Sequence, residues 1–281
     1  MRILIIFGLF FGISFQSVCA QGFTKRRDSG SKELCLYGGM AYYIGDLNQT
    51  GHFMYQDPAG GLGFRYNINS RFALRANGWV GKIHASDVNS NSAVQRQRNL
   101  SFESLIIEGS AQAEFNFYPF KIGTDEFFSP YIFIGVGGFH FNPQAKIGSD
   151  KYDLRQLSTE GQGTAAKPGS KRYKLTQLTM PFGLGFRWSI GRHVGIGFEW
   201  GMRKTFTDYI DDVSTTYPDA AALNSPEAIV LSDRTLNKDP NISNIGRQRG
   251  DSKNQDWYSF TGIILSFTLP QKEAPCAGVQ K

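Results

Sequence analysis

The chain has 281 residues, of which 41% are hydrophobic and 14% aromatic, with 32 glycines and a formal net charge of +6. This length suits one domain of the barrel kind, and after the first residues no apolar run is long enough for a membrane helix, which disfavours a helical membrane protein. A net positive charge could favour binding to nucleic acid. No basic motif with interleaved aromatic residues appears, however, so we expect no nucleic acid as a partner.

The first residues predict a secretory signal peptide. Arg2 precedes an apolar run over 3–15, and small residues lie near the expected cleavage site, with Ala20 directly before Gln21. This order predicts export, with cleavage before Gln21. A rival interpretation makes Cys19 a lipid acceptor, but that signal requires a small residue directly before the cysteine, and Val18 stands there.

Eight segments alternate apolar and polar side chains with the two-residue period of a β-strand. In chain order they are 33–43, 61–68, 72–80, 104–117, 129–141, 177–188, 194–203 and 257–268. The clearest is 104–117, where apolar and small residues oppose Glu108 and Glu114. Segment 129–141 is apolar on both faces, so its orientation stays undecided. The pattern predicts an all-β fold.

The polar faces of these strands carry small residues, amides and charges of both signs rather than the lysines and glutamates of a solvated surface. The charged members are Arg65, Arg75, Glu108, Glu114, Arg187, Glu199 and Arg203. We interpret them as an ion-pair network that fills a narrow lumen, with the charge-free apolar faces turned toward lipid. A two-sheet sandwich would also alternate, and a soluble lipid-binding barrel would have its apolar face inside. The missing surface charges favour the membrane barrel.

The connections between the strands alternate in length. Long connections cover 44–60, 84–101, 142–174 and 207–255, and shorter ones cover 69–71, 118–128 and 190–193. Because transmembrane barrels have short periplasmic turns and longer external loops, we predict a single antiparallel transmembrane β-barrel of eight strands. Turn residues make the longest loop irregular, with one short helix at 218–231.

The predicted organisation has four parts. They are a signal peptide over 1–20, a periplasmic N-terminal segment over 21–32, an outer-membrane barrel over 33–268 and a periplasmic C-terminal tail over 269–281. The turns beside the termini carry Asn69, Ser70 and Arg192, which are candidate contacts for a periplasmic partner. Eight strands enclose a lumen just wide enough for their own side chains, so the barrel is no conduit for folded protein.

The expected surroundings of the barrel are outer-membrane lipid and lipopolysaccharide. Loss of Arg2 with the signal lowers the net charge from +6 to +5, because the first twenty residues hold no acid. In an exported chain a basic balance favours anionic lipid over nucleic acid.

Clusters that could carry chemistry have simpler structural interpretations. The candidates for hydrolysis near the external rim are His84, His140, Asp208, Asp211 and Asp212. Nothing in their spacing secures a base, its acid partner and an oriented water within hydrogen-bond reach. The acidic group at 208–212 lacks the glycine and regular oxygen spacing of a calcium loop, and the glycines at 161–163 lack the residues of a phosphate loop. We therefore predict no catalytic residue, metal or cofactor.

Two cysteines remain after removal of the signal peptide, Cys35 and Cys276. If the first strand pairs with the last, both lie near the periplasmic rim, where oxidising conditions prevail, so they form a candidate disulfide. The alternative is that Cys35 is a small buried residue that faces inward with Tyr37 and Gly39.

Six stretches spread over most of the mature chain resemble one family. They are Tyr43–Asn48, Arg98–Phe102, Ser129–Tyr131, Leu157–Gly163, Pro181–Gly183 and Thr207–Thr215. The chain thereby resembles the small outer-membrane barrel proteins of Bacteroidota, including the PorG-type component of the type IX secretion system. The motif residues are Gly45, Asp46, Glu160, Gly161, Gln162, Gly163, Asp208, Tyr209, Asp211 and Asp212.

The resemblance implies a non-enzymatic barrel that anchors a periplasmic ring of lipoprotein and partner subunits to the outer membrane and aids protein secretion. Because most motif residues fall on loops expected outside the cell, they are expected to shape the external cap or to meet another translocon subunit. The alternative function is a free-standing small barrel for surface adhesion or envelope integrity. Secretion-ring subunits should co-purify with the anchor and not with the free-standing barrel.

Overall fold

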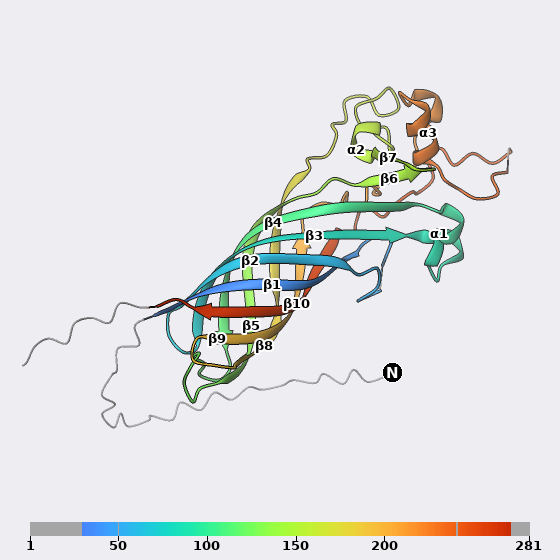
Figure 1. Cartoon of the computed structure of the whole chain (residues 1–281). Coiled ribbons are helices and arrows are strands. Elements are labelled where there is room, and N and C mark those ends of the chain that lie inside the picture. Colours follow the sequence, from blue (N-terminus) through green and yellow to red (C-terminus); the bar gives the residue numbers. More distant parts are fainter. Residues whose placement is uncertain (1–29, 50, 240, 271–281) are drawn as a thin grey trace, which may run out of the picture.

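The computed structural model describes residues 30–49, 51–239 and 241–270. The expected signal peptide, most of the expected N-terminal segment and Cys276 lie outside these residues. Eight long strands form a single closed antiparallel barrel, as predicted (Figure 1). They are β1 (Ser31–Ile44), β2 (Asp57–Asn67), β3 (Phe72–Ser86), β4 (Ser101–Asn116), β5 (Phe128–His140), β8 (Thr176–Ser189), β9 (Val194–Thr205) and β10 (Trp257–Thr268).

Each barrel strand pairs with its neighbour along the chain, and β1 closes the barrel against β10. The N–H of Thr268 at the end of β10 donates to the carbonyl of His193 at 2.9 Å, and Ser31 pairs with Asn67. Both ends of the barrel segment therefore lie beside the short turns. We call this the turn end, and the opposite end, which carries the four long connections, the loop end.

The long connections hold short elements that the sequence pattern did not indicate, apart from the helix expected at 218–231. These elements are η1 (Asp87–Asn89), α1 (Ala93–Arg98), β6 (Gln144–Ile147), β7 (Asp150–Asp153), α2 (Leu154–Leu157), η2 (Ala220–Ala222) and α3 (Pro226–Ser232). The expected helix is present as α3, which begins at Pro226 because Ser225 caps it by accepting from the N–H of Ala228 at 3.1 Å.

Outward side chains of the barrel are apolar and exposed in the isolated chain. On β5, whose orientation the sequence left open, Ile134 and Val136 point outward with 57% and 69% of their surface exposed, while Tyr131 and Phe133 are buried inside. Aromatic rings thus help to fill the lumen, which is why this strand is apolar on both faces.

One outward side chain is nevertheless buried. Tyr42 belongs to the outer face of β1, but the loop after β1 folds back over the wall and places the ring of Phe53 5.3 Å from that of Tyr42. The indole N–H of Trp200 on β9 donates to the Tyr42 hydroxyl at 3.0 Å. An aromatic cluster therefore covers the outer wall near the loop end.

The seven charged residues expected in the lumen are buried there and linked by ion pairs. The Glu114 carboxylate lies 2.9 Å from both Arg65 Nε and Arg75 Nη1, and Arg75 Nη1 also contacts Glu199 at 2.6 Å. Arg203 pairs with Glu108 at 3.1 Å. A charge placed in this narrow interior needs an opposite charge close by, because water cannot solvate it.

The remaining lumen charges complete this network. Arg187 Nη1 lies 3.8 Å from the Glu114 carboxylate, and its guanidinium lies over the buried ring of Phe120 in the connection between β4 and β5. Glu33 at the start of β1 was not predicted, and it pairs with Arg65 at 2.8 Å. The ion pairs thus connect four arginines with four glutamates, so this interior network carries no net charge.

Loss of the central carboxylate is expected to destabilise the barrel. Glu114→Gln leaves Arg65 and Arg75 short of one charge partner, and breaking a buried pair in this way costs about 3–5 kcal/mol. Glu126→Gln, at an exposed position in a turn, is the matched control and should cost less than about 1 kcal/mol. Denaturant unfolding of the detergent-purified barrel measures both, and equal stability of the two variants would contradict the network.

Candidate functional site

The ten motif residues converge at the loop end of the barrel. They belong to the loop after β1, the connection between β5 and β8, and the connection between β9 and β10. We call the connections at this end (45–56, 87–100, 141–175 and 206–256) the cap. Figure 1 shows α1, α2 and α3 gathered there, away from the start of β1.

Glu160 ties two of these connections together. Its fully buried carboxylate accepts from the N–H of Ser214 at 2.8 Å, from the N–H and hydroxyl of Thr215 at 3.0 and 2.6 Å, and from Arg249 at 3.1 Å. Charge-assisted bonds of this kind are about twice as strong as neutral ones. Glu160 therefore holds the β9–β10 connection against the β5–β8 connection.

The glycines beside Glu160 make its turn feasible. Gly161 has a φ of 80° and Gly163 a φ of 72°, a region that favours glycine. A side chain on Gly161 would also crowd Ala166, whose Cβ would lie 2.8 Å away. Gln162 between them is buried and forms a β-bridge with Lys167.

Asp212 also links the β9–β10 connection to the β5–β8 connection. Its carboxylate accepts from the hydroxyl of Tyr173 at 2.7 Å and from that of Thr159, and its carbonyl accepts from Arg249 at 2.6 Å. Burial raises the pKa of Asp212 to about 6. The ring of Tyr209 stacks on Tyr173 with centroids 4.7 Å apart.

Asp211 shares a proton network with Tyr43 and Asp256. The Tyr43 hydroxyl oxygen lies 2.7 Å from Asp211 and 2.6 Å from Asp256. Since a phenol carries one hydrogen, it can donate to one carboxylate only, and the other carboxyl must itself hold a proton to bond the phenol oxygen. Burial raises the pKa of both aspartates well above 3.8, which agrees with this requirement. A side chain on Gly45 would overlap both the hydroxyl and Asp256, so this position requires glycine.

The remaining acidic motif residues, Asp46 and Asp208, lie in the same cap. The Asp46 carboxylate accepts from the N–H of Asp251 at 2.8 Å, and burial raises its pKa to about 6. Burial also raises the pKa of Asp208, to about 8. The cap is thus rich in carboxyl groups that retain protons at unusually high pH.

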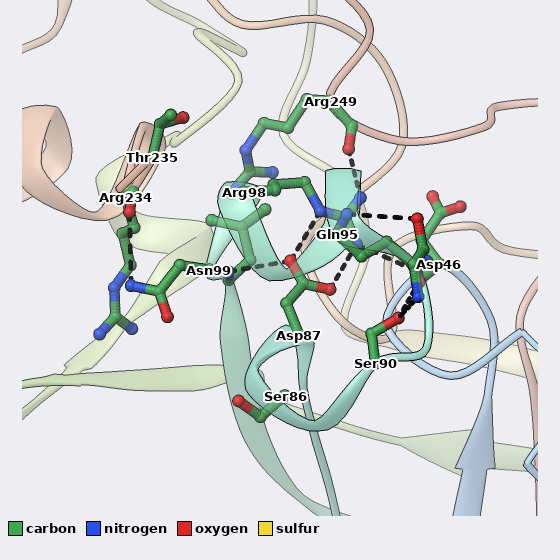
Figure 2. A network of polar contacts seen from close by, with 12 residues as sticks. Asp46, Ser86, Asp87, Ser90, Gln95, Arg98, Asn99, Arg234, Thr235 and Arg249 are labelled. Atoms are coloured by element: carbon green, nitrogen blue, oxygen red, sulfur yellow. Dashed lines mark hydrogen bonds and ion pairs between the residues drawn. The ribbon is translucent and has the colours of Figure 1, made fainter. Parts of the chain in front are cut away.

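A second polar network, which the sequence analysis did not predict, is centred on Arg98 and includes the backbone of Asp46 (Figure 2). Arg98 donates to both oxygens of Asp87 at 2.7 and 2.8 Å, and to the carbonyls of Arg249 and Asp46 at 2.6 and 3.0 Å. One guanidinium therefore joins three connections. Arg98 begins one of the stretches that resemble the family. The sequence pattern does not predict its role in the cap, because its hydrogen-bond partners lie up to 151 residues away.

Most of the polar motif residues are buried inside the cap. Asp46, Glu160, Gln162, Asp211 and Asp212 have at most 6% of their surface exposed. A partner cannot reach side chains that are occupied inside the cap. Their contacts therefore support the expectation that they shape the cap, while the cap surface is made by other residues.

The candidate turn contacts lie at the opposite end. Asn69 Oδ1 accepts from the N–H groups of Arg71 and Phe72 at 2.8 Å, and the Ser70 carbonyl accepts from the N–H of Phe120 at 3.0 Å. Arg192 is exposed in the turn before β9. Asn69 and Ser70 thus fix the turns, and Arg192 offers a charged side chain at the turn end.

Cys35 faces the lumen and is fully buried, with its Sγ 3.5 Å from the Ser266 hydroxyl. Its expected partner Cys276 lies outside the described residues, so the disulfide stays a prediction.

The residues weighed for hydrolysis have separate partners. His84 contacts Asp57, His140 lies 3.1 Å from the Thr176 hydroxyl, and Asp211 contacts Tyr43. Among the described residues, no group of three or more His, Cys, Asp or Glu side chains has the geometry of a metal site. In the same part of the chain, no helix is long and apolar enough to cross a membrane.

Residues 15–227 match the family model described as "Domain of unknown function (DUF6089)". The chain belongs to this family. The DUF6089 match includes all ten motif residues, from Gly45 to Asp212. No curated protein matches the chain.

Solved structures similar to this DUF6089 protein are small outer-membrane barrels. Ail, the attachment invasion locus protein of Yersinia pestis, has 8% identity and a TM-score of 0.40 over 85% of this chain and 99% of its own. Neisserial surface protein A has 7% identity and a TM-score of 0.38 over 85% and 96%. OprG from Pseudomonas aeruginosa has 12% identity and a TM-score of 0.36 over 84% and 96%. At these values the likeness concerns the barrel fold alone.

Removal of the Glu160 charge is expected to loosen the cap without unfolding the barrel. Glu160→Gln breaks the buried pair with Arg249, so proteolysis of the β9–β10 connection in detergent should accelerate roughly a hundredfold. Glu227→Gln, at a half-buried position on α3, is the control and should match the parent protein. Unchanged cleavage of the Glu160 variant would show that this carboxylate does not hold the cap.

The cap is expected to lose stability as pH rises. A carboxyl whose folded pKa is raised contributes stability that is complete below its ordinary value of 3.8 and is lost as pH rises through the folded pKa. For Asp46, Asp212 and Asp208 this window extends from 3.8 through about 6 to about 8. Near-ultraviolet circular dichroism of the cap tyrosines during heating measures the loss. Asp208→Asn should remove the upper part of the pH dependence, and an unchanged profile would contradict this assignment.

Proposed function

We propose that the chain is a non-enzymatic barrel of the bacterial outer membrane, exported by its signal peptide. The observation that carries this proposal is the sidedness of the strands. Outward residues such as Leu74, Leu105 and Ile134 expose 51–57% of their surface, whereas the charged residues of the same strands are buried inside. Apolar surface of this extent is unfavourable in water and favourable against hydrocarbon.

We further propose that the barrel is a component of the type IX protein secretion machinery and anchors its periplasmic lipoprotein ring to the outer membrane. The resemblance of the six motif stretches supports this role. The lumen supports it as well, because a barrel filled by ion pairs and aromatic rings is suited to act as a fixed body rather than as a channel. Under this proposal the ring meets the turn end, where Arg192 is exposed and Asn69 and Ser70 hold the turns.

The second candidate is a free-standing barrel for surface adhesion or envelope integrity. The observation that favours it is where the short elements lie: within the described residues 30–270, all seven belong to the cap, and the connections at the turn end hold none. A function that depends on the cap would act outside the cell and need no periplasmic ring.

Affinity purification of the full chain from detergent extracts separates the two candidates. The anchor predicts that secretion-ring subunits co-purify, and that Arg192→Glu lowers their yield while Lys253→Glu in the cap leaves it unchanged. Absence of ring subunits from the parent protein would refute the anchor and leave the free-standing barrel. Equal yields from both variants would place the ring contact away from the Arg192 turn.

A further inference from the structure

The tip of the loop between β1 and β2 presents two large apolar side chains on the outside of the barrel. Phe53 and Met54 expose 51% and 46% of their surface. On β1 itself, outward Leu34 and Met40 expose 47% and 45%. The loop tip is therefore as accessible as the apolar wall that faces lipid in the proposed membrane position.

Contacts with the outer wall hold the tip in place. The ring of Phe53 lies 5.3 Å from that of Tyr42 on β1 and 6.2 Å from that of Trp200 on β9. The ring of His52 lies 6.3 Å from that of Trp200, and its Nδ1 lies 3.3 Å from the Tyr42 hydroxyl. The tip thus covers part of the wall, and its far side takes the place of that part at the surface.

The backbone of the tip is fixed as well. Phe53 and Tyr55 have φ angles of 60° and 53°, a region that residues other than glycine adopt only at a cost in free energy. The Tyr55 hydroxyl donates to the carbonyl of Ser86 at 3.0 Å, and the Gln56 amide donates to the carbonyl of Phe53 at 2.9 Å. These bonds hold the turn, so the exposure of Phe53 and Met54 belongs to the folded loop.

Formal charge is absent from this part of the loop. Residues 47–56 contain no Lys, Arg, Asp or Glu. Each of the other three connections of the cap carries such residues, as Asp87 and Arg96 do in 87–100. Charged side chains keep a loop in water, because transfer of an ion into hydrocarbon is costly. The composition of 47–56 therefore permits contact with hydrocarbon, in contrast to that of the other connections.

The tip lies beside the edge at which the outer wall becomes charged. Trp200, which the tip contacts, is followed toward the loop end of β9 by Lys204. The Lys204 ammonium lies 5.9 Å from the ring centroid of Trp257 on the adjacent strand β10. Aromatic rings next to such a charged edge are typical of the level at which a barrel meets the lipid headgroups. The tip therefore lies at the outermost part of the apolar band.

We infer that Phe53 and Met54 insert into the leaflet at the loop end, just beneath its headgroups, and fix the depth of the barrel in the membrane. The inference rests on the proposed position of the barrel in the outer membrane. Acyl chains are the partner because the tip continues the apolar wall: Met40 is the next outward residue of β1 after Tyr42 on the side of the turn end. The medium that covers this wall also covers the tip.

A fluorophore on the tip of the full chain, reconstituted in phosphatidylcholine vesicles, tests the inference. Met54→Cys carries the label in a Cys276→Ser background, and Val94→Cys on α1, which is apolar and 78% exposed in the parent chain, is the matched control. Lipids with brominated acyl chains should quench the Met54 label and not the Val94 label. Because hydrocarbon excludes ions, aqueous iodide should quench the Met54 label roughly tenfold less than the Val94 label.

Loss of the neighbouring aromatic side chain should weaken insertion. Phe53→Ser removes about half of the apolar surface that the tip places in hydrocarbon, so iodide should quench the Met54 label about fivefold more strongly. Val88→Ser removes an exposed apolar side chain from another connection of the cap and should leave the quenching unchanged. Equal quenching in the two variants would contradict a role of Phe53 in insertion.

A label at Leu62→Cys, on the outer face of β2, separates the tip from the barrel. If brominated lipids quench this label while iodide quenches the Met54 label as strongly as the Val94 label, the inference is overturned and the membrane barrel stands. Protection of the Met54 label from both quenchers would mean that protein covers the tip, and would also overturn the inference. If iodide reaches the Leu62 label as readily as the Val94 label, the membrane barrel itself fails.

Discussion

Electroneutrality of the lumen is the constraint on which the barrel depends. Eight strands enclose too little space for a water column, so each charged side chain that points inward must find its counter-charge on another strand. Glu114 on β4 meets Arg65 from β2 and Arg75 from β3, and Arg203 on β9 meets Glu108 on β4. Such pairs form only in one register, because a slip by one residue would turn the charges toward the outside.

The rest of the lumen follows from the same lack of space. Trp79 and Phe260 stack with ring centroids 4.8 Å apart, and the guanidinium of Arg203 lies over the Phe260 ring. Flat rings fill the interior toward the loop end, and their faces attract the neighbouring cation. The barrel is therefore a solid body, and its external features depend on the cap and on the outer wall.

The cap also uses buried carboxylates, but there they bind backbone N–H groups as well as arginine side chains. Its connections have little regular structure, so buried carboxylates satisfy backbone N–H groups that no strand or helix satisfies, as Glu160 does for Ser214 and Thr215. Crowded acids then retain protons, as around Tyr43. The family motif is explained by this role: its glycines permit close approach and positive φ, and its acids join the connections to one another.

Sequence reasoning predicted the barrel and the lumen charges because both depend on a local two-residue period, as in 104–117. It missed Glu33, which lies at the edge of the first strand, and the β6–β7 hairpin, whose strands of four residues are too short for a period to show. The roles of Arg98, Asp87, Arg249 and Asp256 could not be predicted because they depend on contacts between distant connections. The burial of the motif acids could not be predicted from the sequence either, because an acidic residue in a loop is normally expected to be exposed to solvent.

The most direct test of the account is whether hydrocarbon lies against alternate residues of one strand. Cysteine introduced at Ala111 or Ala113, which point outward on β4, or at Ser110 or Gln112, which point inward, can be treated in a reconstituted bilayer with a thiol reagent that dissolves in hydrocarbon. The outward pair should react quickly and the inward pair slowly. Equal reaction at all four positions, or faster reaction at the inward pair, would contradict a barrel that holds its charges inside and faces lipid outside.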